Sequence, residues 1–132
     1  MSALYTLKVI TDFAASHILE GHPGKCARLH GHNWTLEVEA EARSLNSIGM
    51  AMDFADLKAL VSQVVDDMDH RHLNDLADFD GINPTAEHLA AVVYRRVAEG
   101  LADYPAEVTA VTVWETPRAG VRYTRSDDSQ PR

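Results

Sequence analysis

Apolar and polar residues alternate in two segments of the N-terminal third of the chain, and this two-residue period predicts β-strands. Between residues 4 and 16 one parity is largely apolar, and between residues 30 and 43 apolar positions alternate with glutamates. Gly21, Pro23 and Gly24 predict a loop between the two segments. The second segment has the pattern of an antiparallel strand with one buried face.

Two later segments change to helical spacing. Residues 54–68 place apolar side chains three or four positions apart, and Asp53 before them is a candidate N-cap. A second helix is predicted from the sequence Asn83-Pro84-Thr85 to about Ala102, with Pro84 or Thr85 in its first turn. Residues 69–81, between the two helices, are predicted to form a polar connection.

The C-terminal part predicts a β-hairpin. Residues 107–115 are rich in valine and threonine, and a turn at 116–120 leads into a strand at 121–125. The order ββααββ predicts an α+β fold, a four-stranded antiparallel sheet with both helices on one face. Because such a sheet has open edges, we expect a closed oligomer that covers them. We also expect one domain over residues 1–125 and a polar tail over residues 126–132.

Composition narrows the classes of partner. The 132 residues contain 12 Lys and Arg against 20 Asp and Glu, a formal net charge of −8. This balance disfavours nucleic acids and anionic membranes, which bind clustered cations. No apolar run approaches the roughly 20 residues of a membrane span. The single cysteine cannot form an intramolecular disulfide, and the N-terminus lacks the features of a secretory signal, so we expect a cytoplasmic protein.

Three of the seven histidines lie where the two N-terminal strands meet their loop. His30 and His32 share one strand face, about 6.5–7 Å apart along the strand, and two imidazoles at that separation can bind one metal ion. His17, at the end of the preceding strand, comes near them if the strands pair. Three neutral imidazoles with an open fourth position are a recurrent catalytic zinc arrangement, and the alternative is a group of polar residues at strand ends.

Cys26 lies four residues before His30 in a polar loop. It is either a fourth metal ligand, which would close the site, or a free thiol beside the metal. Lys25 and Arg28 would favour the thiolate, the form that acts as a base or a nucleophile. A structural role as a small buried hydrophobe fits a polar loop less well.

Other candidates lie outside this loop. Asp69 and His70 are adjacent, and a carboxylate can orient an imidazole for proton transfer, although spacing alone favours a surface pair. Glu115 ends a predicted strand on the parity of its buried valines. It is either exposed there or directed at a ligand, since a carboxylate can accept two parallel N–H bonds from an aminopyrimidine. His72 is predicted to be solvated.

Five separated blocks together resemble the 6-pyruvoyl-tetrahydropterin synthase superfamily, and the similarity extends from about Leu4 to Tyr123. The blocks are Cys26-x-x-x-His30-Gly31-His32 with His17 before it, GMAMDFADLK (49–58), MDHRHLND (68–75), NPTAEHLA (83–90) and VTVWET (111–116). The spacing from Cys26 to His30 resembles the bacterial 6-carboxytetrahydropterin synthase branch of the 7-deazaguanine and queuosine pathway. The animal-type pyruvoyl enzymes have a longer gap at this point.

The resemblance implies a tunnelling fold whose subunits assemble as a hexamer of two stacked trimers, with active sites between subunits. It also implies a pterin triphosphate as substrate. The implied roles are zinc ligands for His17, His30 and His32, catalytic groups for Cys26, Asp69 and His70, and substrate binding for Glu115, Thr85 and Phe54.

Some positions depart from the family pattern, and alternative functions stay open. In NPTAEHLA, His88 stands after Glu87, where the family usually has an asparagine. Trp34 replaces the commoner tyrosine or phenylalanine after HGH. A pyruvoyl-forming enzyme would share every ligand. Cleavage of the dihydroneopterin side chain to a hydroxymethyl pterin is also compatible chemistry. A non-catalytic zinc-binding scaffold is disfavoured, because a scaffold has no need of Cys26, Asp69, His70 and Glu115 together.

Overall fold

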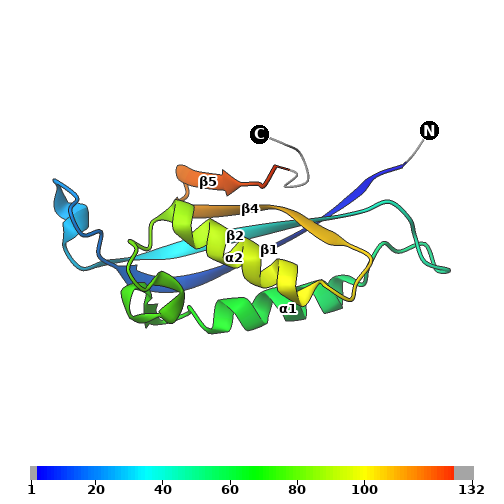
Figure 1. Ribbon diagram of the computed structural model, residues 1–132, viewed down its shortest axis with the longest axis horizontal. Coiled ribbons are helices and arrows are strands. Elements are labelled where there is room, and N and C mark those ends of the chain that lie inside the picture. Colours follow the sequence, from blue (N-terminus) through cyan, green and yellow to red (C-terminus); the bar gives the residue numbers. More distant parts are fainter. Residues whose placement is uncertain (1–2, 127–132) are drawn as a thin grey trace.

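The computed structural model describes residues 3–126, which form one sheet with two helices on one of its faces (Figure 1). The predicted α+β class is confirmed. The strands are β1 (Tyr5–His17), β2 (His30–Ala42), β3 (Arg71–His72), β4 (Glu107–Thr116) and β5 (Ala119–Tyr123). The α-helices are α1 (Phe54–Asp66) and α2 (Ala86–Gly100), and three short 3-10 helices are η1 (Lys25–Ala27), η2 (Leu73–Asp75) and η3 (Ala77–Phe79).

The sheet has five strands in the order β3-β1-β2-β4-β5, so the prediction of four strands was wrong by one. The additional strand, β3, lies in the predicted polar connection and pairs in parallel with Ala15 and Ser16 of β1. Two residues are too few to show an alternating pattern, which is why periodicity did not predict this strand. The edges of the sheet within residues 3–126 are therefore β3 and β5.

Alternation in β1 and β2 produces the buried face that carries the helices. The two strands pair antiparallel over their whole length, from Tyr5 opposite Ala42 to His17 opposite His30. Helix α1 contributes one apolar stripe to the core, and α2 packs over β4 and β5. Trp34, the departure from the family pattern, is completely buried in this core, as expected of a core substitution.

The helix starts agree with the capping signals. The Asp53 side chain accepts a hydrogen bond from the Ala55 N–H at 2.8 Å, which confirms the predicted N-cap of α1. Thr85 caps α2 by accepting from the His88 N–H at 3.1 Å. Helix α2 therefore begins at Ala86, and Pro84 and Thr85 precede its first turn instead of lying within it.

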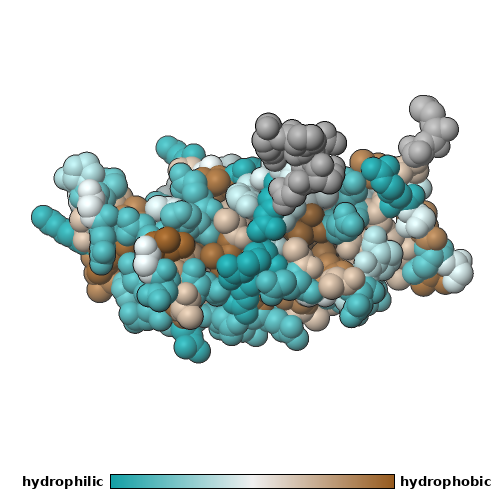
Figure 2. All heavy atoms as spheres, viewed as in Figure 1, coloured by the Kyte–Doolittle hydropathy of each residue, from teal (hydrophilic) through white to brown (hydrophobic). Residues whose placement is uncertain are grey.

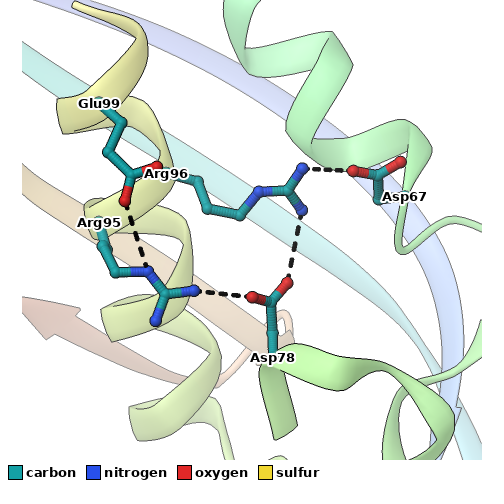
Figure 3. Close-up of polar contacts among 5 residues, drawn as sticks. All are labelled: Asp67, Asp78, Arg95, Arg96 and Glu99. Carbon is teal, nitrogen blue, oxygen red and sulfur yellow. Dashed lines mark hydrogen bonds and ion pairs between the residues drawn. The ribbon is translucent and has the colours of Figure 1, made fainter. Parts of the chain in front are cut away.

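An ion-pair network holds the connection between the helices against α2 (Figure 3). Arg96 bridges Asp67, just after α1, and Asp78 in η3, while Arg95 pairs with Asp78 at 2.7 Å and with Glu99 at 3.8 Å. A single exposed ion pair stabilises a fold by only about 0–1 kcal/mol. A network in which ion pairs share residues restrains its side chains more than an isolated pair does. The two aspartates of the network, Asp67 and Asp78, precede and follow Asp69 and His70 in the sequence.

The helix-bearing side of the molecule is largely hydrophilic, with apolar side chains in small groups (Figure 2), in keeping with the net charge of −8. Among residues 3–126, no helix is long and apolar enough to cross a membrane. Of the predicted tail, Ser126 is described and residues 127–132 lie outside the described residues. The domain limits stay a prediction.

Candidate metal centre

The pairing of β1 with β2 brings the three predicted histidines together. His17 lies directly opposite His30, and His32 lies opposite Ala15, one step further along the same buried face. The ring centroids are 4.4 Å apart for His17 and His30, 5.2 Å for His17 and His32, and 4.9 Å for His30 and His32. One potential ligand atom of each histidine lies within 4.8 Å of those of the other two. The three side chains could therefore hold one metal ion.

Main-chain carbonyls determine which ring nitrogens face the cluster. Nδ1 of His17 donates to the Pro84 carbonyl at 2.8 Å, and Nδ1 of His30 donates to the Arg28 carbonyl at 2.7 Å. A carbonyl can only accept, so these Nδ1 atoms carry the proton and Nε2 is left with a free lone pair. Histidine ligands of metals are typically oriented by such a bond from the other nitrogen.

The Nε2 atoms of His17, His30 and His32 are all buried and lack a hydrogen-bond partner. Three buried ring nitrogens without a partner in one place are costly in a folded protein unless something binds them. Burial also lowers the pKa of His17 and of His32, an effect only partly opposed by the Pro84 carbonyl at His17 and by the nearby Glu115 carboxylate. These rings are consequently neutral at pH 7, the form that binds a metal ion.

Trp34 and Glu115 border the histidine cluster. The Trp34 ring stands edge-on to His17 and His32, at centroid distances of 5.1 and 5.2 Å, and its Nε1 donates to the Ala15 carbonyl at 3.2 Å. Glu115 Oε1 lies 3.4 Å from His32 Nε2, within ion-pair distance but without hydrogen-bond geometry. Glu115 lies at an irregularity in the β4–β5 ladder and shares the strand parity of the buried Val111 and Val113. The acid is thus directed at the site, one of the two alternatives left open by the sequence.

Cys26 lies in η1, within the loop that joins β1 to β2. Its side chain is half-buried, and among the described residues the potential metal-ligand group contains the three histidines and not this cysteine. This grouping favours the free-thiol alternative over a fourth ligand.

Asp69 and His70 form a pair on the other side of β1, beside β3. Asp69 Oδ1 accepts from the Ala14 N–H at 2.9 Å and lies 3.0 Å from His70 Nδ1. His70 has φ of 59°, the only positive φ of a non-glycine residue within residues 3–126. Left-handed backbone is unfavourable for such residues and is concentrated at functional sites. The imidazole is 82% exposed, so the pair presents an oriented histidine to the surface.

A cleft of about 470 Å³ is lined by His70 and, of the three cluster histidines, by His32 alone. His72 also lines the cleft, and its Nδ1 lies 2.9 Å from Ser16 Oγ. The prediction that His72 is merely solvated was therefore wrong, because β3 pairing places it beside Ser16. Arg71 contributes the cation of the cleft.

The remaining predicted residues have separate surroundings. Phe54 opens α1 with a side chain that is 52% exposed. The Thr85 hydroxyl is engaged as a helix cap, beside the carbonyl that binds His17. His88 donates from Nδ1 to the Asn83 carbonyl at 2.7 Å and so stabilises the turn before α2. The roles of Phe54 and Thr85 in substrate binding stay predictions.

Comparison with known proteins identifies the family. A family model described as 6-pyruvoyl tetrahydropterin synthase matches residues 6–126. The chain belongs to this family. A solved structure of 6-pyruvoyl tetrahydropterin synthase from Caenorhabditis elegans is similar with a TM-score of 0.85 and 28% identity, covering 95% of this chain and 98% of that one.

Named relatives within the 6-pyruvoyl tetrahydropterin synthase family differ in activity. A 6-carboxy-5,6,7,8-tetrahydropterin synthase from Synechocystis is 37% identical over 117 residues, covering 85% of this chain and 87% of the relative. A dihydroneopterin monophosphate aldolase from Pyrococcus furiosus is 38% identical over 95 residues, covering 70% and 75%. Percentage identity therefore defines the family but does not separate its reactions.

Replacing His17 by Gln should weaken zinc binding by about 100-fold or more, since even partners of metal ligands contribute about 10- to 100-fold. The affinity can be measured by competition with a chromophoric chelator, with circular dichroism as a check on folding. His22→Gln is the matched control, because His22 is exposed and outside the cluster. Equal zinc affinity in the two variants would contradict a three-histidine site.

Replacing Asp69 by Asn should change how stability depends on pH. The Ala14 N–H, and secondarily His70, hold the pKa of the Asp69 carboxyl below its usual range. Its stabilising effect is therefore complete above the unfolded-state value of about 3.9 and is lost as the pH falls through the lower folded-state pKa. The substituted amide keeps an acceptor for the Ala14 N–H but does not titrate. Denaturant unfolding should show wild type losing stability relative to the variant below about pH 4, and parallel pH profiles would contradict this.

Proposed function

We propose that this protein is a zinc-dependent 6-carboxy-5,6,7,8-tetrahydropterin synthase that acts on 7,8-dihydroneopterin triphosphate. The observation that carries the proposal is the convergence of three buried, unpartnered histidine Nε2 atoms beside Glu115, in a member of this family. The spacing of Cys26 from His30 and the similarity to the Synechocystis protein support the carboxy-forming branch.

His17, His30 and His32 would hold the zinc ion through their Nε2 atoms. Three neutral nitrogen donors suit zinc and leave a position open for substrate. The bound ion would supply Lewis acidity toward hydroxyl oxygens of the substrate's side chain. The Pro84 and Arg28 carbonyls keep two of the rings in the required tautomer, so the chain itself prepares the site before metal arrives.

Glu115 would recognise the pterin ring. Its side chain is 31% exposed at the edge of the cluster, which leaves an oxygen accessible to a ligand. A carboxylate can accept from the exocyclic amino group and the adjacent ring N–H of a pterin at once. This pair of bonds would orient the substrate with its side chain toward the three histidines.

Cys26 and the Asp69–His70 pair would move protons at the substrate's side chain. Asp69 orients His70, whose exposure would allow it to act at a neighbouring subunit's site as the family resemblance implies. Cys26 as a thiolate would take the proton from the side-chain carbon next to the ring. Arg71, in the cleft that contains His70, is a candidate for holding the triphosphate.

The proposed reaction balances with one water. Proton transfers reduce the C6=N5 bond of the ring and oxidise the adjacent side-chain carbon to a ketone. Loss of triphosphate then gives a three-carbon side chain with two adjacent carbonyl groups. Hydrolysis of the bond between the two carbonyl carbons yields the 6-carboxylate and acetaldehyde. A pyruvoyl-forming enzyme would stop before that hydrolysis.

The proposal extends to the setting of the enzyme. Within residues 3–126 the sheet has edges at β3 and β5, and an oligomer that pairs them would cover them. The homohexamer of two trimers that the family resemblance implies would be such an oligomer. A single cysteine fits a reducing compartment, and we infer a cytoplasmic location with a role in queuosine or 7-deazaguanine synthesis.

Product analysis tests the proposed reaction. Zinc-loaded protein should convert dihydroneopterin triphosphate to 6-carboxytetrahydropterin with release of about one acetaldehyde per product, detected by mass spectrometry and an aldehyde assay. Pyruvoyl-tetrahydropterin without acetaldehyde, or a hydroxymethyl pterin, would replace the proposal with another reaction of the family. No conversion would favour a non-catalytic zinc protein.

Replacing Cys26 by Ala should separate the thiol from the metal. We expect turnover to fall by at least about 100-fold, as for loss of a general base, while zinc content stays at one per chain. The measurements are steady-state kinetics and metal analysis of the purified variant. Zinc loss in this variant would make Cys26 a ligand, and unchanged turnover would remove its catalytic role.

A further inference from the structure

Two asparagine side chains bind the main chain where β1 ends. Asn74 Oδ1 accepts from the Ile18 N–H and its Nδ2 donates to the Ile18 carbonyl, each at 2.9 Å. Asn83 makes the same pair of bonds with Glu20, again at 2.9 Å each. A side-chain amide presents the same donor and acceptor as a peptide group. The two asparagines therefore bind Ile18 and Glu20 as the main chain of a neighbouring strand would.

The alternation of an extended chain explains why both asparagines lie on one side. Peptide groups of residues two apart point the same way, and the residue between them points the opposite way. Ile18 and Glu20 face the asparagines, and Leu19 faces the loop, where its N–H donates to the Cys26 carbonyl at 2.9 Å. Residues 18–20 thus connect the asparagines on one side with the main chain of Cys26 on the other.

The turn before α2, which contains Asn83, also supports the metal cluster. Pro84, next to Asn83, accepts the Nδ1–H of His17, and His88 binds the Asn83 carbonyl at 2.7 Å. One rigid turn before α2 therefore orients a histidine of the cluster and anchors the loop that carries Cys26. The contacts are 56 residues apart in sequence for Asn74 and 63 for Asn83.

We propose that Asn74 and Asn83 are positioning residues for the Cys26 loop (residues 18–29). By pairing with Ile18 and Glu20 they maintain the main-chain hydrogen bond from the Leu19 N–H to the Cys26 carbonyl. This bond would hold the thiol in a fixed position relative to the three histidines. The consequence for turnover rests on the catalytic role proposed above for Cys26. The anchoring itself is a property of the protein without substrate.

Asn83→Ala and Asn74→Ala test the anchoring first. Each removes two hydrogen bonds, which should speed opening of the loop roughly 5- to 100-fold. The readouts are hydrogen exchange of the Leu19 amide, which contacts neither asparagine, and the alkylation rate of Cys26 with iodoacetamide. Both should rise by that factor in the zinc-loaded protein. Asn74→Ala leaves the turn at Pro84 intact. If Asn83→Ala also loses the metal, Asn74→Ala still measures the anchoring in the zinc-loaded protein.

Asn46→Ala is the matched control. The Asn46 side chain also accepts two main-chain hydrogen bonds in a loop, from Ile48 at 3.1 Å and Met50 at 3.0 Å. Its loop joins β2 to α1 at the opposite end of the sheet from residues 18–29 (Figure 1). It should leave Leu19 exchange and Cys26 alkylation unchanged.

Kinetics then test the link with catalysis. Displacement of the thiol should lower kcat about tenfold or more in the two variants and change KM less than about threefold. Partial unfolding would also lower the apparent kcat at constant KM, so kcat is referred to the folded fraction measured by circular dichroism. Unchanged exchange and alkylation would overturn the anchoring, and a loosened loop with wild-type kcat would overturn the positioning role. If wild type itself converts no dihydroneopterin triphosphate, the proposed function fails, and exchange and alkylation still decide the anchoring.

Discussion

The antiparallel register of β1 and β2 is the constraint on which the site depends. It places His17 opposite His30 and puts His32 on the same face, so three imidazoles meet where the two strands end. A shift of one residue would turn one strand's histidines to the opposite face. The same register buries Trp34 and the alternating apolar side chains, so the packing that stabilises the sheet also fixes the geometry of the cluster.

Hydrogen bonds from outside the two strands complete this arrangement. The carbonyls of Arg28 and Pro84 orient two rings, and Asn74 and Asn83 hold the chain immediately after His17. The ion pairs of Arg95 and Arg96 hold the connection that contains Asp69 and His70. The polar contacts of the segment between α1 and α2 thus serve the site more than the core.

Local patterns in the sequence predicted the long elements and the members of the cluster. Alternation predicted β1 and β2, and parity put His30 and His32 on one face, because both depend only on neighbours in sequence. Strand β3 was missed because two residues carry no periodicity, and the bond of His72 to Ser16 follows from that strand. The asparagine contacts were missed because side-chain amides that bind a distant main chain leave no spacing signal. Parity placed Glu115 with the buried valines of β4, but its approach to His32 joins residues far apart in sequence, which parity does not predict.

In the proposed function, the histidine nitrogens are the only protein ligands of the metal and the Cys26 thiol stays free beside it. Zinc K-edge absorption spectroscopy of the loaded protein measures this directly. We expect three nitrogen ligands at about 2.0–2.1 Å, a remaining oxygen ligand and no sulfur. A sulfur shell at about 2.3 Å would make Cys26 a zinc ligand and contradict its assignment as an acid–base group.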